Sequence, residues 1–127
     1  GAADELRLLE YSQRLARQGR NVMAAPGGST GRALYDEALQ GGARALGAEF
    51  VGLAAGGPAD IVSLDTAHAA FAGAKDDALL DAWIFNAGNG GVDCVWVNGV
   101  KQVSGGRHHK RDAVTAAFFR TMSALAV

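Results

Sequence analysis

The sequence predicts an α+β fold in which two helices precede a small sheet and a third helix closes the chain. Apolar side chains recur at helical spacing over residues 4–18 and again over residues 30–46. An Asn-Gly pair then separates two β-rich runs at 92–97 and 100–103, which is typical of a hairpin. Helical spacing returns over 110–125. At 127 residues the chain has the size of one domain, and no internal repeat is visible.

The first predicted helix spans residues 4–18 and carries an apolar stripe. Leu8, Tyr11 and Leu15 follow one another at intervals of three or four residues, so they share one side of the helix. We expect this stripe to be buried and Glu10, on another side, to face water. The pattern indicates a helix that packs on the rest of the chain through its leucines.

The second predicted helix spans residues 30–46. Ser29 or Thr30 is suited to cap its start, because a hydroxyl oxygen accepts a hydrogen bond from a free N–H group of the first turn. Gly41 and Gly42 lie inside the helix, where each costs about 1 kcal/mol relative to alanine. Since close approach of another backbone favours glycine, we expect tight packing there.

The segments between this helix and the hairpin are short. Residues 50–53 form an apolar stretch, and residues 61–64 are predicted to be a buried strand. Residues 76–84 have the pattern of a short helix with an acidic first turn. Ile84 and Phe85 are candidates for the start of the next extended segment. Asn98-Gly99 favours a type I′ turn, because both turn residues of that type need a positive φ.

The charge and apolar patterns exclude several classes of protein. Twelve Lys and Arg against thirteen Asp and Glu give a net charge of −1, which argues against a nucleic-acid partner. No apolar run approaches the roughly 18–20 residues that span a bilayer, and the sequence does not open on a basic and then apolar leader. Cys94 is the single cysteine, which excludes an internal disulfide and fits a reducing compartment. We therefore expect a cytoplasmic protein without membrane partners.

The three histidines do not have the spacing of a metal site. His68 stands between two alanines and is expected to have a capping or surface role. His108 and His109 are adjacent, so on a regular element they point in different directions and cannot share an ion. A hydrolytic zinc site needs three protein ligands and an open water position. We predict no metal ligand in this chain.

The carboxylates also lack a catalytic arrangement. Asp60 and Asp65 bracket the predicted strand and are expected to form turns. Asp76 and Asp77 lie at a predicted helix start, where negative charge is favoured by the helix dipole. No spacing pairs two of them for acid and base catalysis.

Two further segments have features of a functional site. The loop GGSTG at 27–31 precedes a helix, but it lacks the lysine of a phosphate-binding loop and follows no strand, so helix capping explains it. Cys94 lies within a predicted strand with no histidine near it in sequence, which favours a packed thiol over a nucleophile. The residues thus predict no catalytic, cofactor-binding or metal-binding side chain.

Several segments nevertheless resemble a known enzyme family. Three segments resemble the C-terminal part of the amidohydrolase superfamily: ALQGGARALG at 38–47, GGPADIVSLD at 56–65 and VWVNGV at 95–100. Within that superfamily, four segments resemble the formimidoylglutamate deiminase family: LRLLEYSQRL at 6–15, STGRALY at 29–35, DAWIF at 81–85 and GRHH at 106–109.

This resemblance implies a large architecture of which the chain is the last part. Such enzymes have a metal-dependent (β/α)₈ barrel and a composite β-sandwich built from both chain ends. Residues 1–48 would be the C-terminal helices of the barrel. Residues 49–127 would be the C-terminal strands of the sandwich domain with its closing helix. The partner implied for this chain is the missing N-terminal part of the same enzyme, and open strand edges would otherwise favour self-association.

The resemblance also implies a reaction. The full-length family uses zinc to hydrolyse a non-peptide C–N bond, here that of N-formimidoyl-L-glutamate, giving N-formyl-L-glutamate and ammonia in histidine degradation. The metal-ligand motifs of the family do not occur in these 127 residues, so the chain alone is expected to be inactive.

Two alternatives remain open at this point. The chain is also compatible with a piece of another amidohydrolase deaminase, such as a relative of guanine deaminase or of the chlorohydrolases. From a different class, it is compatible with a free-standing, non-catalytic interaction domain. High stability as a monomer at any concentration would favour the second alternative.

Overall fold

A computed structural model describes residues 1–49 and 51–126 and shows the predicted α+β fold. The α-helices of the described residues are α1 (Ala2–Arg17), α2 (Thr30–Leu46), α3 (Ala78–Ala82) and α4 (Arg111–Leu125). The strands are β1 (Ile61–Leu64), β2 (Val92–Val97), β3 (Val100–Ser104) and β4 (Arg107–His108). Three short helical segments join them: η1 (Ala69–Phe71), η2 (Trp83–Ala87) and η3 (Gly88–Gly91).

The strands form one antiparallel sheet in the order β1-β2-β3-β4. Asn98 and Gly99 have φ values of 48° and 76°, so the predicted hairpin turn with two positive φ angles is confirmed. Strand β4 was not predicted. It forms because Gly105 and Gly106, with φ values of 56° and 69°, reverse the chain and return it to β3.

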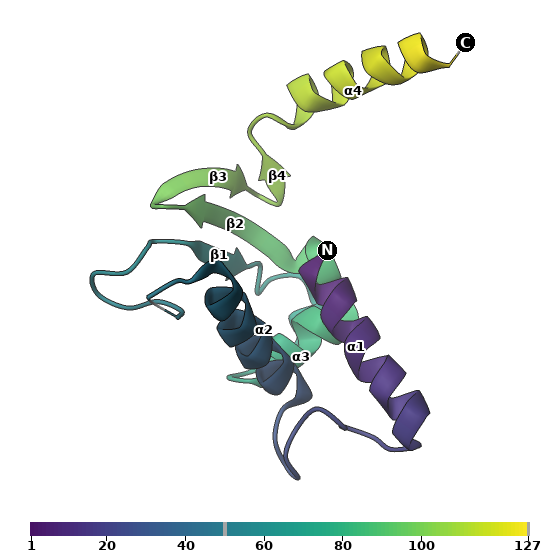
Figure 1. Cartoon of the computed structure of the whole chain (residues 1–127), viewed down its shortest axis with the longest axis vertical. Coiled ribbons are helices and arrows are strands. Elements are labelled where there is room, and N and C mark those ends of the chain that lie inside the picture. Colours follow the sequence, from purple (N-terminus) through teal and green to yellow (C-terminus); the bar gives the residue numbers. More distant parts are fainter. Residues whose placement is uncertain (50, 127) are drawn as a thin grey trace.

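The helices divide between the two ends of the molecule. Helices α1 and α2 gather with α3 at the β1 end of the sheet, whereas α4 extends beyond β4 (Figure 1). The buried core lies among the first group and consists of Ala3, Leu34, Phe71, Ala82, Trp83 and Ile84. Helix α4 contributes no buried residue to it.

Two predictions for the middle of the chain need correction. Ile84 and Phe85 are not extended: they continue from α3 into η2, because Ile84 is fully buried in the core and helical geometry keeps it there. Strand β1 forms as predicted but is not buried. It lies at the edge of the sheet, so Val62 is 56% exposed. Phe50, in the apolar stretch 50–53, lies outside the described residues.

Helix α1 forms as predicted, but it is turned opposite to the predicted orientation. Leu8 and Leu15 are 63% and 82% exposed, whereas Glu10 is fully buried. The reason is that α1 packs on the core through the side that carries Ala3 and Leu6. Leu8 and Leu15 therefore face away from the rest of the described chain, whereas Tyr11 lies at the margin and stacks on Phe85.

Helix α2 confirms the predicted ends but not the predicted packing. Ser29 accepts the capping hydrogen bond, and Gly47 ends the helix with a φ of 64°. The expectation of tight packing at Gly41 and Gly42 is wrong, since a Cβ atom at either position would meet nothing within 4 Å. Only the first half of α2, around Leu34, enters the core.

Candidate functional site

The start of α2 was the best candidate for an anion site, and the chain itself occupies it. The backbone N–H of Gly31 donates to the Asp81 carboxylate at 2.6 Å, and the N–H of Arg32 donates to the Ser29 hydroxyl at 2.9 Å. A Cβ atom at Gly31 would lie 2.5 Å from the backbone nitrogen of Asp81, so glycine permits this close approach. The prediction of a helix cap at this loop is confirmed.

His68 has the capping role predicted for it. Its Nδ1 atom accepts a hydrogen bond from the N–H of Ala70 at 3.2 Å, at the start of η1. The imidazole ring also meets the Phe71 ring edge to face, with 6.1 Å between centroids. Both contacts are within its own segment and serve to shape that turn.

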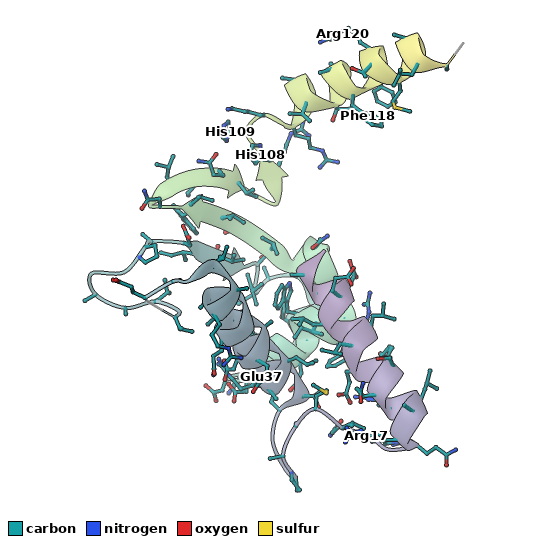
Figure 2. The ribbon with its side chains drawn as sticks, viewed as in Figure 1. Arg17, Glu37, His108, His109, Phe118 and Arg120 are labelled. Carbon is teal, nitrogen blue, oxygen red and sulfur yellow. The ribbon has the colours of Figure 1, made fainter. Side chains whose placement is uncertain are left out.

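The prediction that His108 and His109 point in different directions assumed a regular element, and that condition is not met, since β4 ends at His108. Their rings stack at 4.5 Å with an interplanar angle of 21°, because His109 follows β4 in a turn rather than continuing the strand. Figure 2 shows both side chains at the link between β4 and α4. The His108 Nδ1 atom accepts from the N–H of Lys110, and His109 Nδ1 lies 3.0 Å from the carbonyl oxygen of Gln102.

Stacking also bears on whether the two histidines can bind a metal. The nitrogen lone pairs of imidazole lie in the ring plane, so two nearly parallel rings direct them along parallel planes rather than toward one point. More widely, residues 1–49 and 51–126 contain no cluster of three or more His, Cys, Asp or Glu side chains able to hold a metal ion.

Cys94 and the aspartates serve the local fold. Cys94 is buried, as predicted for a packed thiol, and its Sγ atom lies 3.3 Å from the Asp93 carboxylate. Asp60 accepts from the N–H of Asn98 at 2.6 Å, and Asp65 accepts from the N–H of the residue two positions later at 3.0 Å. The Asp65 bond agrees with the predicted turn-forming role, whereas Asp60 instead joins the start of β1 to the hairpin turn at Asn98.

Glu10 is the polar residue that sequence reasoning placed wrongly. Its Oε1 atom accepts from Arg14 Nε at 2.6 Å and from the N–H of Val22 at 3.0 Å, and Oε2 accepts from the N–H of Met23 at 3.0 Å. Burial alone would raise the pKa of Glu10. The hydrogen bonds from Arg14, Met23 and Val22, and the Arg14 charge, outweigh burial and hold the pKa below its ordinary value.

Aromatic rings complete the surroundings of this ion pair. The Arg14 guanidinium lies 5.4 Å from the Tyr11 ring centroid and 5.6 Å from that of Phe85, and the two rings stack on each other. The pair thus fastens the loop after α1 to the helix and to η2. The spacing Ala3–Leu6–Glu10 matches one helix face and could have revealed it from the sequence.

Two hollows lie beside β1. An open groove of about 580 Å³ runs between α2 and the segment 51–62, and its apolar lining includes Leu39, Leu46 and Leu53. A pocket of about 120 Å³ adjoins it; this pocket is lined by Tyr35, Val62, Leu64, Leu80 and Trp83. Tyr35 and Val62 line both hollows, so the two lie next to each other.

Exposed apolar side chains extend over two helices. On α1 they include Leu8 and Leu15, and on α4 they are Val114, Phe118, Phe119, Met122 and Leu125. Figure 2 shows Phe118 on α4, away from the sheet. None of the helices in the described part of the chain is long and apolar enough to cross a membrane. Exposed apolar side chains grouped on a helix are typical of surfaces that contact other protein, so the candidate functional site is an interface.

Comparisons with known proteins indicate which kind of protein contains such an interface. No family model matches the chain. Formimidoylglutamate deiminase of Pseudomonas aeruginosa is 42% identical over 123 residues, which is 96% of this chain and 27% of that enzyme. The crystal structure of an amidohydrolase from Brucella melitensis is 51% identical and matches with a TM-score of 0.90, covering 100% of this chain and 28% of that one.

The extent of these matches is as informative as the identity. The chain spans little more than a quarter of the length of either relative, while nearly all of its own residues are matched. Its sequence and fold therefore correspond to one part of an amidohydrolase, and its sequence is similar to that of a formimidoylglutamate deiminase.

Proposed function

We propose that this chain is the C-terminal portion of an enzyme that hydrolyses N-formimidoyl-L-glutamate to N-formyl-L-glutamate and ammonia, a step of histidine degradation. The observation that carries the proposal is the 42% identity to formimidoylglutamate deiminase over 96% of the chain. The structural match at 51% identity to an amidohydrolase agrees with a hydrolytic parent.

Within that enzyme the chain would act as scaffold. Residues 1–48 would cover one side of a barrel, and residues 49–127 would complete a β-sandwich domain. The exposed leucines of α1 and the exposed apolar residues of α4 support this role, because each face is apolar yet lacks cover within the described chain. The free edge of β1 similarly offers a place for a further strand.

The zinc implied by the family resemblance does not fit the residues described here. His68 uses Nδ1 in a cap, the rings of His108 and His109 stack, and no cluster of three potential ligands occurs in the described ranges. In the proposal, the metal ligands therefore belong to the part of the enzyme outside these 127 residues. We expect the chain alone to bind no stoichiometric zinc.

The test compares the complete gene product with the 127-residue chain. Both are incubated with N-formimidoyl-L-glutamate, and ammonia and N-formyl-L-glutamate are measured. We expect turnover by the complete protein and none by the chain. Turnover of guanine in place of formimidoylglutamate would favour a different deaminase, and activity of the chain alone would contradict its role as scaffold.

A further inference from the structure

Apolar side chains extend around most of helix α4. Every residue of this helix is exposed in the described chain. At about 100° of rotation per residue, Val114, Phe118 and Leu125 lie within about 40° of one another on one side. Phe119 projects about 100° from Phe118, and Arg120 is the single charged residue of the last three turns. A helix that is apolar on most sides is normally buried, so α4 has a cover that the described chain does not supply.

The link before α4 holds the helix as a projecting arm. The Arg107 side chain of β4 forms an ion pair with Asp112 in the first turn of α4. The N–H of His109 donates to the carbonyl oxygen of Gln102 in β3 at 3.1 Å. Contacts to β3 and β4 thus fix the direction of α4, which extends beyond β4 and away from α1 and α2 (Figure 1).

The solved amidohydrolase keeps α4 in this position. Its match covers 100% of the chain with a TM-score of 0.90. Helix α4 has 15 of the 127 residues, so even a perfect match of the other 112 alone would give at most 112/127, or about 0.88. The arm is therefore retained inside a complete amidohydrolase chain, of which the matched part is 28%.

The place of α4 in the fold favours a second copy of the enzyme as its cover. Under the proposed function, α1 and α2 cover a barrel, so the bulk of the remaining polypeptide lies at the β1 end of the sheet. Strand β4 is the opposite edge, and α4 leaves from it. What meets α4 on that side is another molecule, and closed assemblies of identical chains are the commonest case.

The charges at the ends of α4 favour an antiparallel partner helix. Lys110 and Arg111 stand at the start of α4, where the helix dipole is positive, and its last turn has no basic residue. An antiparallel α4 of a second copy brings these two cations beside its negative C-terminal end. Figure 2 shows that Arg120 and Phe118 lie on opposite edges of the helix, which leaves the Phe118 side free of charge for the contact.

The apolar area is sufficient for such a contact. The large apolar side chains of α4 are 47–71% exposed. Their cover would remove roughly 600 Å² from water on each copy and about 1,200 Å² in total, which is the lower limit of a standard stable interface.

We propose that the complete enzyme is a dimer in which α4 of each copy packs antiparallel on α4 of the other. Val114 of one copy then lies beside Leu125 of the other, and Phe118 beside Met122. The contact is isologous, so each of these pairs occurs twice. The inference rests on the proposed function, which supplies the complete enzyme and places its barrel at the far end of the sheet.

A charge on the apolar side of α4 tests the dimer. The molar mass of the complete enzyme is measured by sedimentation equilibrium for the unmodified protein, Phe118→Glu and Ser123→Glu. Ser123 is the control, because it projects about 140° from Phe118 on the polar side of the same helix. We expect a dimer for the unmodified enzyme and for Ser123→Glu, and a folded monomer for Phe118→Glu, since α4 contributes nothing to the buried core. A monomeric unmodified enzyme, or a Phe118→Glu enzyme that remains dimeric, would overturn the proposal.

Paired cysteines test the antiparallel register in an enzyme that is otherwise unmodified. Val114 and Leu125 are about 16 Å apart along one helix, too far for a disulfide within one copy. We expect Val114→Cys combined with Leu125→Cys to form a covalent dimer on oxidation, seen on a non-reducing gel, and neither single variant to do so. A covalent dimer from a single variant would indicate parallel helices. That result, or no covalent dimer from the double variant, would overturn the proposed pairing.

An activity assay separates this inference from the proposed function. The unmodified enzyme is assayed with N-formimidoyl-L-glutamate alongside the measurements of mass. Turnover by an enzyme whose mass Phe118→Glu does not change would overturn the α4 contact and leave the proposed function in place. A dimer that Phe118→Glu dissociates, without turnover by the unmodified enzyme, would overturn the proposed substrate and leave the α4 contact in place.

Discussion

The two sides of α1 show opposite relations between polarity and burial. The inner side buries Ala3 and the carboxylate of Glu10, whereas the outer side exposes Leu8 and Leu15. A buried carboxylate is stable only with partners, and Glu10 has three hydrogen bonds and an opposite charge. The exposed leucines have no such compensation. The comparison shows that the described chain supplies hydrogen-bond partners for its buried carboxylate but does not cover the apolar surface on the outer side of α1.

The largest expected effect on stability comes from a substitution at Glu10, on the buried side of α1. Glu10→Ala removes the acceptor of three donors and leaves Arg14 without its partner. We expect the free energy of unfolding to fall by about 3–5 kcal/mol, as for other disrupted buried ion pairs. Urea unfolding followed by tryptophan fluorescence measures the change.

Asp36→Ala provides a matched control, because Asp36 also pairs with an arginine four residues away but on the surface. Its removal is expected to cost less than about 1 kcal/mol. Equal losses for Glu10→Ala and Asp36→Ala would contradict the importance of burial at Glu10.

The same pair makes stability depend on pH. The pKa of Glu10 in the folded chain lies below its ordinary value. The contribution of Glu10 to the free energy of unfolding is therefore present above the ordinary pKa, and it is lost as the pH falls through the lowered pKa. The Glu10→Gln variant cannot titrate at this position. We therefore expect its unfolding free energy to fall less than that of the unmodified chain on acidification. Parallel profiles would argue against the ion pair.

The next largest effect concerns the outer side of α1. In the complete enzyme, Leu15→Ala is expected to lower the free energy of unfolding by about 2–5 kcal/mol, because the side chain would there be packed. In the 127-residue chain the side chain is 82% exposed, so the change should stay within about 0.5 kcal/mol. A larger loss in the complete enzyme than in the 127-residue chain would show that other protein covers this face of α1. Equal losses in the two proteins would count against the scaffold role.

The smallest effects compare glycines within α2. Gly31→Ala would bring a Cβ atom to 2.5 Å from the Asp81 backbone, so we expect a loss of about 1–3 kcal/mol. At Gly42 nothing lies within 4 Å, so Gly42→Ala should raise stability by about 0.5–1 kcal/mol through helix propensity. Thermal unfolding of both variants measures these shifts. A loss at Gly42 would reveal a contact on this half of the helix.

Local patterns in the sequence were sufficient for the elements but not for their orientation. The helix cap at Ser29 and the turn at Asn98-Gly99 were predictable, because each depends on neighbouring residues alone. The orientation of α1 was not, since Leu8 and Leu15 give the stronger apolar stripe and the rule that apolar residues lie inside assumes a complete core.

The candidate site was harder to predict from the sequence for the same reason. Burial of Glu10 depends on a loop twelve and thirteen residues away, and the pocket at Trp83 depends on β1 and α2 meeting in space. No spacing within one segment encodes these contacts. The stacking of His108 on His109 likewise follows from a turn after β4 that the sequence did not reveal.

The bond between Gly31 and Asp81 has a consequence for the ionic surroundings of the protein. It joins positions 50 residues apart and brings a fixed negative charge to the positive end of the α2 dipole. That end is thereby neutralised by the polypeptide itself. Helix α2 consequently needs no dissolved phosphate or sulfate to compensate its dipole, whatever salt surrounds it.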